Sequence, residues 1–388
     1  MGTTTGTLPG EVTAGGQDAY IRKYNASGVE QWTVQFGTAA VDVAEGVSLD
    51  SLGNVYVAGY TQGTLPGQVS AGSQDAFVRK YNSSGAEQWT SQFGTTNQDS
   101  AFAVALDSSN NVFVAGQTLG TFAGQANAGG SDGFVRKLSS AGVVAWTREF
   151  GTFDYENAQG CATDASGNVF VVGQTFGSFG GVSAGGYDAY VRRLDSNGNN
   201  PWTRQLGSIE SDAAHAVATD ASGNVFIAGE AEDALPGQTA ISTTGSVDSF
   251  VAKYDGTGAL LWTREFGTTT QDVMEAITVD SSGNAIAVGE ISGVLSGHVS
   301  AGGAYDHAVG TAEQYRVVGT GGGQACEHLA VHGRALSCRC RGTSGRCPAD
   351  SRCRGSGSAG AVRGPVRQRR PARPTAMPAP GRSPRRRR

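Results

Sequence analysis

The sequence predicts an all-β protein, a β-propeller of four-stranded blades, from three observations. Tryptophans recur at spacings of 57, 57, 56 and 60 residues, at Trp32, Trp89, Trp146, Trp202 and Trp262, and such a period indicates a repeat architecture. Each repeat contains four short runs of alternating apolar and polar residues, with turn residues between them and no helical period. One of the four runs is built of small residues, as expected where several sheets converge on an axis.

The four strands are clearest in the second copy of the repeat. In its tryptophan-bearing run, Trp89 and Phe93 share one face, while Gln88 and Gln92 share the other. This period of two is that of a strand with one buried face. The predicted strands of this copy are Asp75–Tyr81, Glu87–Phe93, Asp99–Asp107 and Asn111–Gln117.

The connections between the strands are of two kinds. Segments such as 82–85 and 164–168 are rich in Asp, Asn, Ser and Gly and predict tight hairpins. The connections at 94–98 and 61–74 are longer. Alternate connections of an up-and-down sheet lie at the same end, so one face of the protein carries the tight turns. We call the opposite face, which carries every long connection, the long-loop face.

The run that begins at Asp99 is predicted to be the innermost strand of its blade. Ala101, Ala103 and Ala105 lie on one face of it, and Ala158, Gly160 and Ala162 repeat this pattern in the next copy. The tryptophan then lies on the outermost strand, where we expect it to act as a wedge between neighbouring sheets.

Three strings carry a family resemblance: AVALDSSNNVFVAGQT (103–118), DGFVRKL (132–138) and AWTREFG (145–151). They closely resemble the bacterial SBBP β-propeller repeat, and the resemblance covers about residues 1–302. It implies a propeller, often seven-bladed, in secreted or surface proteins of bacteria. It supplies no catalytic residues. An extracellular or cell-surface location is therefore implied by the resemblance alone, because no signal peptide is recognisable in this chain.

The predicted blades are about 42–93, 99–150, 156–206 and 212–266. Two further strands (18–36) form an outer half-blade and residues 272–290 an inner half-blade, so five blade-equivalents are present. These could close a ring of five. We favour a fragment of a six- or seven-bladed ring, because arrays of this kind are usually longer.

Composition separates residues 1–302 from residues 303–388. The first part carries 12 Lys and Arg against 30 Asp and Glu, whereas the second carries 17 Arg and four acids. We expect 303–388 to be a disordered tail rich in Arg, Gly, Pro and Cys. The repeat pattern stops after Asp306, which we interpret as out-of-frame translation. Without a folded scaffold, the arginines predict no nucleic-acid site. No apolar run reaches the about 18 residues of a transmembrane segment.

An acidic residue opens each inner strand. If these strands line an axis, their carboxylates ring one mouth of it on the long-loop face, and carboxylate oxygens suit Ca²⁺. The alternative is that each carboxylate accepts N–H groups of its own loop. The acids of this possible cation ring are Asp42, Asp99, Glu156, Asp212 and Asp272.

The third position after that acid differs among the copies, as Glu45, Phe102, Gln159, His215 and Glu275. Variation within a repeated framework is where a single specific site would lie. We therefore take Glu45, Gln159, His215 and Glu275 as candidate ligand-binding residues, although a half-buried histidine such as His215 is more often structural.

These observations favour a non-enzymatic protein, a binding or scaffold module with its ligand on the long-loop face. Carbohydrate or protein at the cell surface are the partners we expect, and no cofactor is required beyond an optional Ca²⁺. The alternative is a propeller enzyme, such as a glycan hydrolase that uses acids at the mouth. That chemistry needs one carboxyl pair rather than five equivalent acids.

Overall fold

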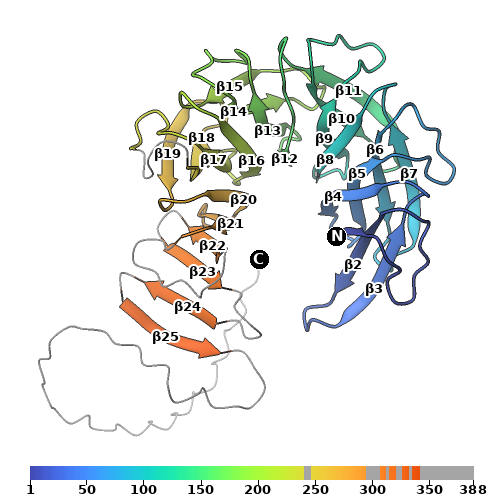
Figure 1. The fold of residues 1–388 in the computed structure, drawn as a ribbon, viewed down its shortest axis with the longest axis horizontal. Helices are drawn as coiled ribbons and strands as arrows, with labels where there is room; N and C mark the ends of the chain where they lie inside the picture. The colour runs from blue at the N-terminus through green and yellow to red at the C-terminus, as the bar shows by residue number, and fades with distance from the viewer. Residues whose placement is uncertain (240–245, 294–305, 312–313, 320–325, 332–333, 341–388) are drawn as a thin grey trace, which may run out of the picture. The chain divides into compact units, whose positions relative to one another are not determined.

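The computed structural model describes residues 1–239 and 246–293, together with the backbone of four strands between residues 306 and 340. In this part of the chain, secondary structure consists of β-strands joined by turns and loops (Figure 1). Within the same residues, no helix is long and apolar enough to cross a membrane. The all-β prediction is confirmed.

Four antiparallel sheets of four strands follow one another along the chain, and each corresponds to one predicted blade. Blade A consists of β4 (Asp42–Leu49), β5 (Val55–Thr61), β6 (Asp75–Tyr81) and β7 (Glu87–Phe93), and blade B consists of β8 (Asp99–Leu106), β9 (Val112–Thr118), β10 (Asp132–Leu138) and β11 (Val144–Phe150). Blade C consists of β12 (Gly160–Thr163), β13 (Val169–Thr175), β14 (Asp188–Leu194) and β15 (Trp202–Leu206). Blade D consists of β16 (Asp212–Thr219), β17 (Val225–Ala231), β18 (Asp248–Tyr254) and β19 (Leu260–Phe266).

Two further sheets flank these blades in the sequence. The first contains β1 (Gly2–Thr4), β2 (Asp18–Tyr24) and β3 (Glu30–Phe36), and β2 and β3 are the predicted outer half-blade. The second begins with the predicted inner half-blade. Its strands are β20 (Asp272–Val279), β21 (Ala285–Ile291), β22 (Asp306–Thr311), β23 (Gln314–Gly319), β24 (Cys326–Val331) and β25 (Arg334–Cys340).

Strands β22–β25 lie within the segment that the sequence predicts to be a disordered tail. Strand β22 pairs with β21 in the register Ile291↔Asp306, which repeats the Ala231↔Asp248 pairing of blade D. The backbone groups along β21 need partners, and β22 supplies them. Residues 341–388 lie outside the described residues.

The innermost strands of successive sheets pack on one another. Strand β4 contacts β8, β8 contacts β12, β12 contacts β16, and β16 contacts β20 (Figure 1). The approach is close enough that a Cβ atom added to Gly46 would lie 3.0 Å from backbone atoms of Phe102, Ala103 and Val104. This contact explains why small residues recur on the inner strands.

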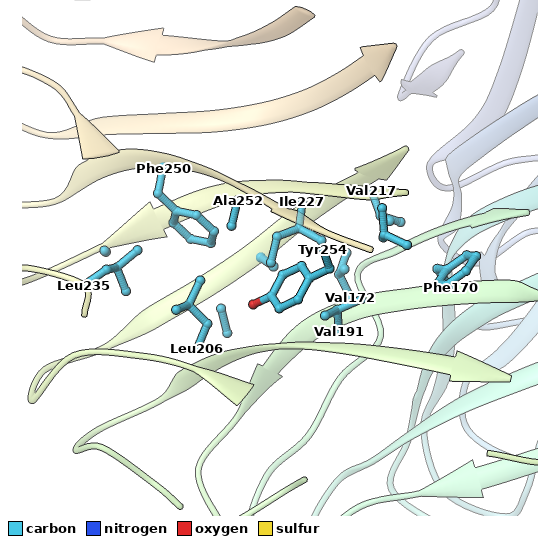
Figure 2. Close-up of a cluster of buried hydrophobic side chains, with 14 of the residues drawn as sticks. Phe170, Val172, Val191, Leu206, Val217, Ile227, Leu235, Phe250, Ala252 and Tyr254 are labelled. Atoms are coloured by element: carbon cyan, nitrogen blue, oxygen red, sulfur yellow. The ribbon is translucent and has the colours of Figure 1, made fainter. Parts of the chain in front are cut away.

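The hydrophobic core lies between the sheets. Figure 2 shows the cluster shared by blades C and D, in which Val172 and Val191 of one sheet meet Ile227 and Phe250 of the next. A similar cluster joins blades A and B, and another joins blades B and C. Because every blade buries its apolar residues against its neighbours, the blades stabilise one another.

The tryptophans also tie neighbouring sheets together, as predicted. Trp89, on the outer strand of blade A, packs its ring against Gly142 in the β10–β11 turn of blade B. Its indole N–H donates a hydrogen bond to the carbonyl of Ser140, at 3.1 Å. The same bond joins Trp32 to Ser83, Trp146 to Ser196 and Trp202 to Gly256, at 3.1, 3.1 and 3.2 Å.

Candidate functional site

The acids that open the inner strands are buried in their own loops. The Oδ2 atom of Asp42 accepts hydrogen bonds from the backbone N–H and the hydroxyl of Thr38, at 2.6 and 3.0 Å. Asp99 accepts the same two bonds from Thr95. The pattern recurs in the pairs Glu156–Thr152, Asp212–Ser208 and Asp272–Thr268.

A second buried acid lies beside each of these carboxylates. Asp75 and Asp99 sit on the two sides of Gly94, where any Cβ atom would collide with both. Burial raises the pKa of Asp99, and the negative charge of Asp75 adds to this effect. In blade D, burial raises the pKa of Asp212 to about 7.

The structure therefore distributes these acids as pairs, one pair at each junction between sheets. Within the described residues, no group of three or more His, Cys, Asp or Glu side chains is arranged to hold a metal ion. The N–H and O–H donors of each loop bind at least one oxygen of every one of these carboxylates, which favours the loop-stabilising interpretation over the cation ring.

The candidate ligand-binding positions lie on an irregularity of the inner strands. Strand β4 pairs Ala44 with Gly59 and Gly46 with Ala58, so Glu45 is an extra residue. Such a β-bulge removes a residue from the ladder and changes the direction of its side chain. Phe102, His215 and Glu275 occupy the same bulge in β8, β16 and β20. Gln159 directly precedes β12.

A second set of varied residues lies on the neighbouring strand of each sheet, and the sequence analysis missed it. The sequence does contain a signal for this set: each of its residues directly follows a buried glycine that recurs in every copy, yet the residue type differs among the copies. The set is Tyr60, Gln117, Gln174, Glu230 and Glu290.

The two sets of varied residues interact. Burial raises the pKa of the Tyr60 phenol, and the negative charge of Glu45 raises it further. In blade D, His215 Nε2 lies 3.5 Å from Oε1 of Glu230. The bulge residue and its neighbour on the next strand therefore act as one unit.

Two such units meet at the junction between blade D and β20–β21 and form a cavity of about 320 Å³. Gln271 and Ser292, in the connections of the long-loop face, complete its rim together with Val273. We call this cavity the acidic pocket; its ionisable residues are His215, Glu230, Glu275 and Glu290.

The acidic pocket brings together two of the four predicted ligand-binding residues, His215 and Glu275. The other two, Glu45 and Gln159, do not line it. Among the residues described as lining it, three carboxylates accompany one imidazole, and no Lys or Arg side chain within the described residues forms an ion pair with these carboxylates. The pocket thus offers hydrogen-bond acceptors and negative charge to a ligand.

The same repeat unit is found in a known family. The sequence model of the SBBP family, described as a beta-propeller repeat, matches residues 31–66 and 88–123. Two segments of the chain are therefore SBBP-type β-propeller repeats. Each matched SBBP unit begins just before a tryptophan and ends beyond the second strand of the next blade, so it contains the tryptophan, the acidic loop and the inner-strand β-bulge.

One curated relative is a regulatory protein, FlaEY of Caulobacter vibrioides. It is 28% identical over 172 residues, which cover 41% of this chain and 18% of FlaEY. The match therefore spans less than a fifth of the relative's length.

Several solved structures show weak similarity. The Neurospora crassa Pan2 WD40 domain is 12% identical at a TM-score of 0.39 and covers 74% of this chain and 82% of its own. A Xanthomonas campestris gluconolactonase is 12% identical at a TM-score of 0.35, and the match covers 71% of this chain and 82% of the gluconolactonase. A glucose dehydrogenase is 10% identical at a TM-score of 0.37, and the match covers 73% of this chain and 92% of the dehydrogenase. We take no function from likenesses of this size.

Proposed function

We propose that this SBBP-type propeller is a non-enzymatic binding module and that its acidic pocket holds a cationic group of the ligand. The observation that carries the proposal is the concentration of Glu230, Glu275 and Glu290 around His215 in a cavity of about 320 Å³. A cavity of this size accommodates an ammonium or guanidinium group with its alkyl stem. Carboxylates bind both groups through charge-assisted hydrogen bonds.

The position of the pocket supports the same function. Its acidic residues lie on bulges and on strand ends at the long-loop face, where the ladder hydrogen bonds do not fix the side-chain type. Blade B forms the same bulge with Phe102, and Tyr60 and Gln117 stand in blades A and B where Glu230 and Glu290 stand in the pocket. The fold therefore does not require the acids that fill the pocket.

Binding of agmatine, which carries one guanidinium and one ammonium group, tests the proposal. We expect isothermal titration calorimetry on the full chain to detect binding that weakens with added NaCl. Glu275→Gln and Glu290→Gln should each weaken it by about three- to fivefold, the range for half-exposed ion pairs. Glu45→Gln is the matched control, because it changes the same bulge position outside the pocket.

Two results would contradict the proposal. One is agmatine binding that the Glu275→Gln/Glu290→Gln double variant retains in full. The other is hydrolysis of a chromogenic glycoside by the full chain that Glu275→Gln abolishes, since this would indicate a glycan hydrolase.

We also propose an extracellular or cell-surface location, which rests on the family resemblance. Fractionation of the bacterium that expresses the native gene, followed by immunoblotting, tests it. Recovery of the protein only from the cytoplasm would contradict it.

A further inference from the structure

We propose a second binding site, for a neutral oligosaccharide, on the long-loop face at the junction of blades B and C. Four aromatic residues gather in the loops there. Phe153 and Tyr155 lie between β11 and β12, and Phe176 and Tyr187 lie between β13 and β14. We call these four residues the aromatic patch.

The rings of the aromatic patch are partly packed and partly open to solvent. Tyr187 contacts Tyr155 edge to face, with ring centroids 5.7 Å apart, and contacts Phe176 in the same way at 5.2 Å. Phe176 remains 46% exposed and Phe153 84% exposed. Exposed aromatic groups of this kind indicate a binding surface.

The fold does not require aromatic residues at these positions. The N–H of Phe176 donates to the carbonyl of Tyr155 at 3.0 Å. The same bond joins Leu119 to Gln98 at 2.9 Å in blade B, where neither residue is aromatic. In the other four copies, Phe153 aligns with Ala39, Thr96, Ile209 and Thr269, and Tyr155 aligns with Val41, Gln98, Ser211 and Gln271. Phe176 aligns with Gln62, Leu119, Glu232 and Ser292, and Tyr187 aligns with Gln17, Gln74, Ser131 and Val247.

Amide and hydroxyl groups surround the aromatic patch. The hydroxyl of Tyr155 donates to Oε1 of Gln117 at 2.9 Å. It also accepts a bond of 3.4 Å from Nδ2 of Asn157. Gln117 is the varied residue of blade B, and it bears an amide where blade D bears Glu230. The groups that hydrogen-bond to Tyr155 are therefore neutral, whereas the acidic pocket presents charge; one carboxylate at this junction is that of Asp154, which is exposed between Phe153 and Tyr155.

A cavity at the junction of blades A and B, which reaches the patch only at Gly129, has the same neutral character. Gly129 packs against the backbone of Phe153 and also lines a cavity of about 730 Å³. Its polar lining residues are Thr95, Thr96, Asn97, Thr121 and Asn127.

None of the residues that line this cavity carries a charge. They are Ala71, Gly94, Thr95, Thr96, Asn97, Leu119, Gly120, Thr121, Ala123, Asn127 and Gly129.

These features together fit a chain of sugar residues. The apolar C–H face of a pyranose ring stacks on an exposed aromatic ring, and its hydroxyls exchange hydrogen bonds with amides and threonine hydroxyls. Gly129 lines the cavity and lies against the backbone of Phe153, so an oligosaccharide bound on the patch would extend toward the cavity. The site is separate from the acidic pocket, and neither proposal depends on the other.

A glycan array probed with the full chain tests the inference. We expect binding to at least one class of neutral oligosaccharide. Phe153→Ala and Phe176→Gln should each weaken that binding by at least about tenfold, because each removes a stacking ring. Both variants should fold, because the first copy has Ala39 and Gln62 at these positions.

Ile209→Ala is the matched control, since Ile209 is 69% exposed at the position of Phe153 in the next junction. It should leave glycan binding unchanged, and so should Glu275→Gln. The inference would be overturned by an array without any neutral glycan bound, or by binding that the Phe153→Ala/Phe176→Gln double variant retains. Preferential binding of choline, a quaternary ammonium ion that aromatic groups also hold, would overturn it as well.

Discussion

The indole N–H of Trp89 donates to the carbonyl of Ser140 across the boundary between blades A and B, at 3.1 Å. The ring of Trp89 covers Gly142 two residues later, in the same turn. Because four tryptophans make this contact, the outer rims of successive blades are joined in the same way.

Gly142→Ala should destabilise the protein more than Gly28→Ala. Both glycines adopt positive φ, +82° and +76°, so either substitution should cost about 1–2 kcal/mol in backbone strain. A Cβ atom at Gly142 would also lie 2.9 Å from the Trp89 ring, whereas nothing lies within 4 Å of a Cβ at Gly28. We expect the collision to add about 1–3 kcal/mol, measured by urea denaturation. Equal losses in the two variants would contradict the wedge role of Trp89.

Glu149→Gln should stabilise the protein above pH 7. Glu149 occupies the position in blade B that Gln92 occupies in blade A. The amide of Gln92 donates a hydrogen bond to Asp75 at 2.7 Å, whereas the carboxyl group of Glu149 lies beside that of Asp132. Burial raises the pKa of Glu149 from 4.5 to about 7, and the charge of Asp132 contributes. The folded state thus holds a proton that the unfolded state releases, and stability falls as the pH rises from 4.5 to 7.

A glutamine at position 149 donates at every pH. We therefore expect a gain of about 1–3 kcal/mol at pH 8 and little change at pH 4, measured by thermal denaturation. The reverse substitution, Gln92→Glu, should introduce the same pH-dependent loss into blade A. A gain of equal size at both pH values would show that the ionisation of Glu149 is not its cause.

Asp99→Ala should destabilise the protein whether or not Ca²⁺ is present. The substitution leaves the N–H of Thr95 buried without its acceptor, at an expected cost of about 1–3 kcal/mol. We also expect neither CaCl₂ nor a chelator to change the melting temperature of the wild-type protein. A rise with Ca²⁺ that Asp99→Ala removes would restore the cation-ring hypothesis.

Glu45→Gln should lower the pKa of Tyr60, because the charge of Glu45 raises it in the folded protein. The ionisation of the phenol can be followed by its ultraviolet absorbance in an alkaline titration, with Tyr60→Phe identifying the signal. Glu30→Gln is the control, since Glu30 pairs with Arg22 at 3.4 Å on another sheet. An unchanged Tyr60 titration in Glu45→Gln would mean that the bulge residue does not reach β5.

Much of the fold follows from the sequence because the repeated positions are those that every blade needs. Strands β6 and β7 were predicted at their observed bounds, and β9 is displaced by one residue at each end. The tryptophan contact was predicted because a large ring at a fixed period has few other uses.

The site was only partly predictable. His215 and Glu275 were recognised as varied residues, but the β-bulge that displaces them from the ladder was not, because four of the five inner strands share the irregularity and it does not distinguish these copies. Glu230 and Glu290 were missed for a related reason, since they lie on the neighbouring strand, and the sequence of one strand does not show which residues of the next strand stand beside it. That the two sets form one pocket depends on the packing of successive sheets, which no single repeat reveals.

The inner-strand bulge also bears on how such a protein can change over evolutionary time. A residue outside the ladder can be exchanged without cost to the hydrogen bonds that hold its sheet. A duplicated repeat thus supplies a new copy whose framework already works and whose bulge position is open to selection. Ligand preference can then diversify one copy at a time, while the strands around it stay the same.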